Sequence, residues 1–140
     1  MTAMRVHAAT SLALSSADAE RFALSWMKDY PKDFEFMTYL GSVAMDSKKF
    51  SDAERYFKAV LTLQPELPAT LNNMAWVLLQ QGKIGATPYA EKANQLAPDQ
   101  AAFMDTLAAA LAAEGQLLKA VDWQRKALAK ASEGASPGYR

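Results

Sequence analysis

The chain repeats itself with a period of 33 to 34 residues. Three prolines mark the period, at positions 31, 65 and 98. An alanine lies twelve residues before each proline, and the row of alanines continues once more: Ala19, Ala53, Ala86 and Ala120. An aromatic residue follows each alanine by three positions: Phe22, Tyr56, Tyr89 and Trp123. Rows that keep one fixed period predict an elongated array of stacked units, because each unit must bury its apolar face against its neighbour.

Each unit reads as two helices, because apolar residues recur at helical spacing on both sides of a turn signal. The first helices are expected at 34–47, 68–81 and 101–114, and the second helices at 51–64, 84–97 and 117–131. A further helix at 17–30 reads as the second helix of an earlier unit, whose first helix, at about 3–14, matches the period poorly. The sequence therefore predicts an all-α solenoid of about seven to eight helices.

The units are expected at about 1–33 (partial), 34–67, 68–100 and 101–131. They make up a solenoid over 1–131, and 132–140 reads as a tail or as the start of a truncated helix. Several polar residues are expected to cap helices, namely Asp33 and Asp99 before first helices and a capping box from Ser51 to Glu54. Pro88 is expected in the first turn of its helix, where proline costs no hydrogen bond.

Small residues recur in the first helices at Gly41, Ala75 and Ala108, opposite the alanine row of the second helices. Together with the closing proline and a spacing of about 34, this pattern resembles the tetratricopeptide repeat over roughly residues 17 to 131. The resemblance implies a right-handed α-solenoid in which the small residues allow close helix packing. Larger side chains at these positions would overpack, at a typical cost of about 1–3 kcal/mol.

A narrower resemblance rests on LNNMAWVLLQQGK, YAEKANQLAPDQ and FMDTLAAALAAEGQ, from position 71 onward. These segments look like the C-terminal repeats of bacterial PEP-CTERM-system TPR lipoproteins, a family linked to protein sorting and extracellular polysaccharide. The chain has no cysteine for lipid attachment. The resemblance therefore implies an excised or truncated part of such a protein, and the ending SEGASPGYR reads like a loop leading into a further helix.

Composition argues against several classes of function. Fifteen basic residues balance fifteen acidic ones, so neither a nucleic-acid footprint nor a basic membrane-binding face is expected. His7 is the single histidine and no cysteine is present, which leaves neither a catalytic constellation nor a metal site. We expect no enzyme activity and no cofactor, and read His7 as exposed or partly packed. No signal peptide or membrane span is expected, which leaves the cytoplasm and the periplasm open.

The resemblance also implies where recognition occurs, since first helices line the concave side of such a solenoid. The candidate groove residues are Thr38, Tyr39, Ser42, Asn72, Asn73, Trp76, Leu79 and Asp105. Asparagine offers a donor and an acceptor to an extended peptide, and tryptophan a large rigid surface. The expected function is a non-catalytic module that binds a protein or peptide segment. The alternative is a purely structural segment of a longer scaffold in a bacterial export or polysaccharide system, with Trp76 as packing.

Two further expectations concern the partner. Family members that grip a carboxylate-ended tail use lysine, arginine and asparagine, whereas the matching positions here are Thr38, Ser42, Asn73, Ala102 and Thr106. An anionic tail is therefore a poor ligand. The last helix has no successor to cover it, and its candidate interface residues are Leu118, Trp123 and Ala127. Either the tail 132–140 folds back over this face or a second chain docks there, and a two-fold homodimer is the favoured expectation.

Overall fold

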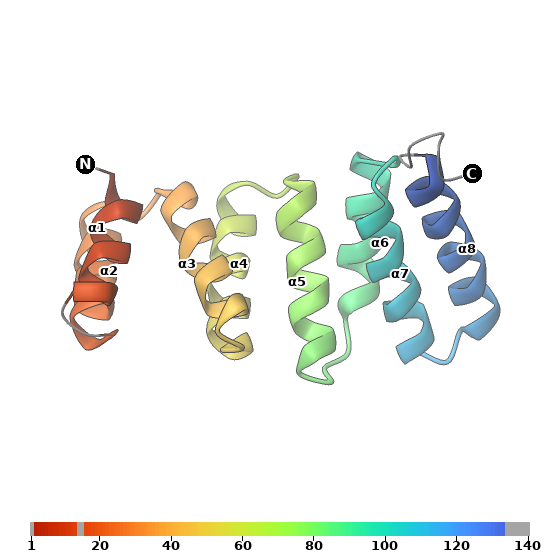
Figure 1. The fold of residues 1–140 in the computed structure, drawn as a ribbon, viewed down its shortest axis with the longest axis horizontal. Coiled ribbons are helices and arrows are strands. Elements are labelled where there is room, and N and C mark those ends of the chain that lie inside the picture. The colour runs from red at the N-terminus through yellow and green to blue at the C-terminus, as the bar shows by residue number, and fades with distance from the viewer. Residues whose placement is uncertain (1, 14–15, 134–140) are drawn as a thin grey trace.

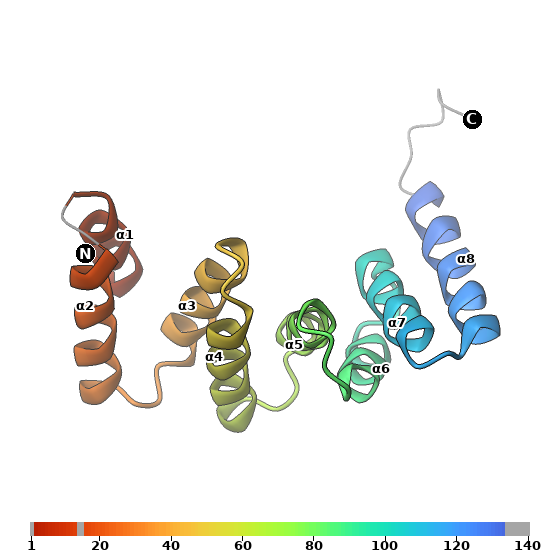
Figure 2. The ribbon, with the colours of Figure 1, turned by 90° about the horizontal axis from the view of Figure 1, so that it is seen from below.

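The chain forms a single row of helices, which the computed structural model describes over residues 2–13 and 16–133 (Figure 1). Within these ranges there are eight helices and no strands: α1 (Ala3–Ala13), α2 (Ser16–Asp29), α3 (Phe34–Asp46), α4 (Phe50–Leu63), α5 (Pro68–Gln80), α6 (Ala86–Leu96), α7 (Ala101–Ala113) and α8 (Leu117–Glu133). The all-α class and the helix count predicted from the period are confirmed. Seen from below, α1 and α2 stand at one end of the row and α7 and α8 at the other (Figure 2).

The expected helix ends agree with the observed ones to within about two residues, but the caps do not all agree. Asp33 caps α3, since its carboxylate accepts a hydrogen bond from the backbone N–H of Phe36. The capping box at Ser51 is wrong, because α4 begins one residue earlier, with Lys49 as its N-cap and no side-chain cap. The cap at Asp99 is also wrong, since Gln100 occupies the N-cap of α7 and makes no such bond.

Prolines and one glycine set the junctions between helices. The second helices α4 and α6 end at Leu63 and Leu96, two residues before Pro65 and Pro98, because proline offers no N–H to a continuing helix. Pro88 lies in the first turn of α6, as expected. Gly85 stands before this helix with φ of 98°, a left-handed conformation that favours glycine.

Close packing within the units follows the small-residue rows. A Cβ atom on Gly41 would lie 2.6 Å from Cε1 of Phe57, so this position of α3 has no room for a side chain against α4. Ala75 and Ala108 occupy the same position in α5 and α7, and both are buried. Counting back 34 residues from Gly41 gives His7 in α1. An imidazole therefore stands where the other units have a small residue, which explains why the first helix departs from the period.

The interior consists of two hydrophobic clusters. The larger one runs from α3 to α8 and includes Phe57, Met74, Val77, Leu107 and Leu111. The smaller one joins α1, α2 and α3 and is rich in aromatic rings, with Phe36 at its centre. The rings of Phe22 and Trp26 lie 6.2 and 6.1 Å from that of Phe36. The first two helices are thus held to the rest of the row mainly by aromatic contacts.

Candidate functional site

The predicted groove residues lie on α3, α5 and α7, and the repeat places them in matching rows. One row is Thr38, Asn72 and Asp105, the next begins with Tyr39 and Asn73, and a third is Ser42, Trp76 and Ala109. Helix α5 carries the central member of each row and contacts α7 directly. The outward face of α5 is therefore the middle of the candidate surface.

Trp76 is the largest exposed group on this face. Its side chain is 42% exposed, whereas its neighbours Ala75 and Val77 are 0% exposed. The helix thus turns its core side to the neighbouring helices and leaves the indole at the surface. Trp76 belongs to neither hydrophobic cluster, so it is available for contact with another molecule.

Asn72 and Asn73 lie one turn before Trp76 and are half-buried. The side-chain oxygen of Asn72 is buried and has no hydrogen-bond partner among the described residues. A buried amide oxygen without a partner is costly, by about 1–3 kcal/mol. Asn72 therefore places an unused acceptor next to an exposed aromatic ring.

The N-terminal part of the candidate surface is already occupied. Tyr39 is half-buried, stacks on Phe36, and its hydroxyl lies 2.9 Å from Nδ1 of His7 in α1. Burial lowers the pKa of His7 and raises the pKa of Tyr39. His7 is buried rather than exposed, because α1 covers this stretch of α3. Thr38 uses its hydroxyl within its own helix, donating to the carbonyl oxygen of Phe34.

The remaining groove candidates differ in their exposure and in their hydrogen bonds. Ser42 is half-buried, and Leu79 is half-buried against the larger hydrophobic cluster. Asp105 is exposed, and its carboxylate accepts a hydrogen bond of 2.7 Å from Gln124 of α8. Asn72, Asn73 and Trp76 are thus the predicted residues that the structure brings together with polar or aromatic capacity to spare.

Sequence reasoning missed a clamp between consecutive units. The Glu54 carboxylate of α4 accepts hydrogen bonds from Lys83 at 2.9 Å and from Gln81 at 2.8 Å. The bond from Lys83, followed by that from Gln81, lowers the pKa of Glu54. Both donors follow the end of α5, so the clamp ties α4 to the next unit. Glu54 and Lys83 are 29 residues apart, as are Glu20 and Lys49, so this spacing alone does not distinguish a bonded pair from an unbonded one.

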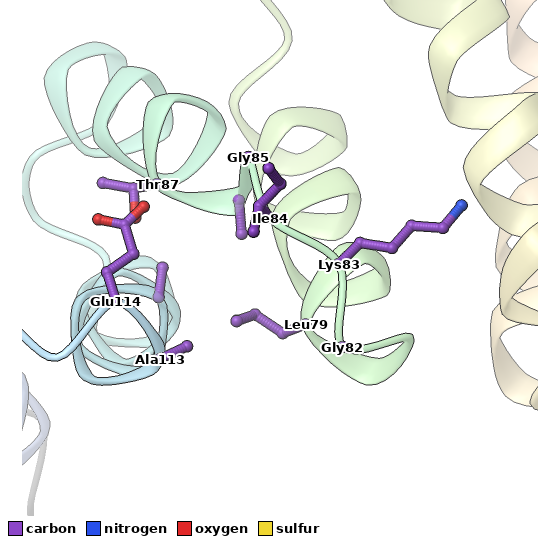
Figure 3. A pocket seen from close by; sticks show the side chains of 10 residues that line it. Leu79, Gly82, Lys83, Ile84, Gly85, Thr87, Ala113 and Glu114 are labelled. Atoms are coloured by element: carbon purple, nitrogen blue, oxygen red, sulfur yellow. The ribbon is translucent and has the colours of Figure 1, made fainter.

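The equivalent junction between α6 and α7 contains a pocket of about 280 Å³ (Figure 3). Counting on 33 residues from Glu54 gives Thr87, whose hydroxyl is buried and has no partner within the described ranges. Glu114 lines the same pocket, and Figure 3 shows Lys83 pointing away from both residues. The pocket lies apart from the Trp76 side chain, which is not among its lining residues.

The predicted end-face residues on α8 divide into three cases. Leu118 is 86% exposed, as expected for a surface residue. Trp123 is half-buried against the larger hydrophobic cluster, with the Lys126 ammonium 4.3 Å from its ring centre. Ala127 is buried, and its inclusion in an exposed interface is wrong, because it faces the interior one turn after Trp123.

Over residues 2–13 and 16–133, no three His, Cys, Asp or Glu side chains gather where they could hold a metal ion. Among the helices described there, none combines the length and the apolar character needed to span a bilayer.

Comparisons with known proteins agree with this architecture. No protein-family model matches the chain. The chain is 32% identical over 83 residues to the human protein O-mannosyl-transferase TMTC3. These 83 residues make up 59% of this chain and 9% of that protein. The chain therefore spans about a tenth of the length of this curated relative.

Solved structures of MamA share the fold. MamA 41-end from Desulfovibrio magneticus RS-1 superimposes with a TM-score of 0.81 at 23% identity, over 94% of this chain and 75% of that one. MamA MSR-1 C2 gives a TM-score of 0.79 at 17% identity, over 95% and 77%. The narrower resemblance to PEP-CTERM-system lipoproteins stays a prediction. The chain has the fold of a tetratricopeptide-repeat protein, in agreement with its period.

Proposed function

We propose that the chain is a non-catalytic protein-interaction module, and that it binds a peptide or protein segment along the face of the first helices. The exposed indole of Trp76 is the observation that carries this proposal, because α5 buries both neighbours of Trp76 completely. A large aromatic ring left at the surface amid buried residues is the kind of group that dominates binding energy at interfaces.

The groups around Trp76 favour an extended, uncharged segment as the ligand. Both asparagines carry amide donors, and the buried side-chain oxygen of Asn72 has no partner among the described residues, so turning this amide toward a ligand would break no hydrogen bond of that oxygen. No lysine or arginine lies among the groove candidates, so a carboxylate-ended tail gains no ion pair there. Main-chain hydrogen bonds and one apolar side chain would supply most of the affinity.

Substitution of Trp76 tests the proposal against the alternative of a purely structural scaffold. An unbiased peptide library is screened for binding to the full chain, and retained peptides are measured again with Trp76→Ala. Binding should weaken at least about tenfold, or 1.4 kcal/mol, while helicity and unfolding stay nearly unchanged. Leu96→Ala on α6, with 39% exposure in the parent chain, is the matched control and should bind normally.

Two results would refute the proposal. Peptides that bind Trp76→Ala as well as the parent chain would show that recognition occurs elsewhere. A loss of the roughly 3–5 kcal/mol of stability typical of a deleted core aromatic would show that Trp76 is packing.

A further inference from the structure

The outer face of α8 presents a row of exposed apolar side chains. Leu118 is 86% exposed and Leu128 is 62% exposed, and Leu117 and Val121 are exposed as well. Leu117, Val121 and Leu128 follow each other at helical spacing, so they form one stripe along the helix. Helix α8 stands last in the row of helices (Figure 1). The stripe therefore contacts no other described helix along most of its length.

The repeat shows what this stripe is built to contact. Positions one and two units before Val121 are Thr87 and Glu54, and those before Leu128 are Asn94 and Leu61. All four earlier residues meet the following first helix or its end. Asn94, for example, is buried and donates a hydrogen bond of 2.9 Å to the carbonyl oxygen of Phe103 in α7. The stripe of α8 thus occupies the surface on which a first helix packs in the earlier units.

A groove beside the stripe completes this surface. Residues of α7 and α8 line an open cavity of about 430 Å³. All but one are small or apolar, and they are Ala108, Ala109, Ala112, Leu117, Ala120, Val121 and the polar Gln124. Alanines along one wall allow another helix to approach closely. The surface therefore fits an amphipathic helix with apolar residues on one side.

We propose that the occupant is a second copy of this chain, which contributes its own α8 in a two-fold antiparallel pair. The stripe is itself the apolar side of an amphipathic helix, so each α8 supplies what the other lacks. A self-complementary contact of this kind closes as a dimer. In this pairing Leu117 of one copy faces Leu128 of the other.

Charge supports the same pairing. With the two-fold axis near Trp123, Asp122 of one copy lies beside Arg125 of the other, and the two pairs are equivalent by symmetry. Neither residue forms an ion pair with another described residue. At the opposite end of the row, the exposed side chains of α1 among residues 3–10 are Arg5, Ala8 and Ala9, which present less apolar surface than the stripe of α8. Head-to-tail stacking of α8 on α1 is thus the weaker arrangement.

Sedimentation velocity of the full chain, over about 1 to 300 µM, tests the proposal. The mass should rise from monomer to dimer as the concentration increases, since one helix pair is a small interface. It should not rise beyond the dimer, because a two-fold contact closes on itself. Leu128→Glu should leave a monomer throughout. Leu24→Glu is the control, because Leu24 on α2 is 64% exposed at the other end of the row, and this variant should dimerise normally. Circular dichroism confirms that both variants fold.

A charge exchange tests the register. Asp122→Arg and Arg125→Asp should each weaken dimerisation about tenfold, and the double variant should restore it, because both symmetry-related pairs are then opposite in charge again. Several results would overturn the proposal. They are a monomer at every concentration, a mass that grows beyond the dimer, a dimer insensitive to Leu128→Glu, or no restoration by the double exchange. A chain ending at Glu133 that dimerises when the full chain does not would assign the stripe to residues 134–140 instead.

Discussion

Two junctions between consecutive units have the same residue types at matching positions but differ in how they are closed. At α4 and α5, Glu54 is bonded to Lys83 and Gln81, and Val77 beside them is completely buried. At α2 and α3, the equivalent residues are Glu20 and Lys49, which share no hydrogen bond, and Val43 is 37% exposed. The repeat pattern alone therefore does not decide whether a junction is closed.

A cavity takes the place of the contact at the α2–α3 junction. It measures about 150 Å³, and Glu20, Val43, Ser47 and Lys49 are among its lining residues. The other end of the same junction is well packed, where Trp26 contacts Phe36 edge to face and donates a hydrogen bond of 2.8 Å to Asp33. The two helices thus meet at one end and diverge at the other.

The bulk of His7 offers a physical reason for this divergence. His7 occupies the position of Gly41, Ala75 and Ala108, and α1 packs against α2 less extensively than first helices pack against second helices in later units. Its ring contacts Tyr39 and Phe36 of α3 instead. The first unit is consequently held by aromatic contacts at one end, and we expect it to move as a unit more readily than the rest.

Replacing Val77 and Val43 by alanine should show the largest difference in stability between the two junctions. Val77→Ala deletes two buried carbon atoms and leaves a cavity, so the free energy of unfolding should fall by roughly 2 kcal/mol. Val43→Ala should cost less than about 0.7 kcal/mol, because its side chain already contacts a cavity and solvent. Urea unfolding followed by circular dichroism measures both. Equal losses for the two valines would contradict the distinction between the junctions.

Replacing Glu54 and Glu20 by glutamine should give a smaller difference in stability between the two junctions. Glu54→Gln removes a charge that accepts two hydrogen bonds, and the expected loss is about 1 kcal/mol, since Lys83 is half exposed and the pair is screened by water. Glu20→Gln should change stability by less than about 0.3 kcal/mol. The contribution of Glu54 should be present above its ordinary pKa of 4.5 and be lost as the pH falls through its lowered folded value.

Titration of His7 should have the smallest effect, confined to the first unit. Burial lowers its pKa below the ordinary value of 6.5, so the unfolded chain binds the proton first as the pH falls. Stability of α1 should therefore decrease below about pH 6.5 and level off below the folded pKa. NMR of the α1 amides between pH 5 and 8 measures this effect, and His7→Gln should abolish it. A pH dependence that persists in His7→Gln would assign the effect to another group.

The period was enough to predict the helices, the buried alanine row and the position of Trp76 on α5. These features depend on local spacing and on the packing of neighbouring helices, and both are written in the sequence. The partners of Glu54 could not be predicted, because they depend on the angle between two units. Glu20 and Lys49 have the same spacing and charges as Glu54 and Lys83, yet they remain apart.

Other errors also arose from geometry beyond one helix. Ala127 was expected at the end face, but α8 is rotated so that Leu118 and Leu128 face outward and Ala127 faces the interior. Tyr39 was expected to be free for a ligand, but the irregular first helix covers it through His7. Helix α1, which matches the period poorly, thus affects the candidate groove more than the regular helices do.

Native-state hydrogen exchange tests most directly the claim that one repeat junction is closed and its counterpart open. Amides in the middle of α2 should exchange at least about a hundredfold faster than those of α4, which corresponds to about 2.7 kcal/mol of opening free energy. Glu54→Gln should accelerate exchange in α4 and α5, whereas Glu20→Gln should leave α2 and α3 unchanged. Equal protection in α2 and α4, together with equal responses to the two substitutions, would contradict that claim.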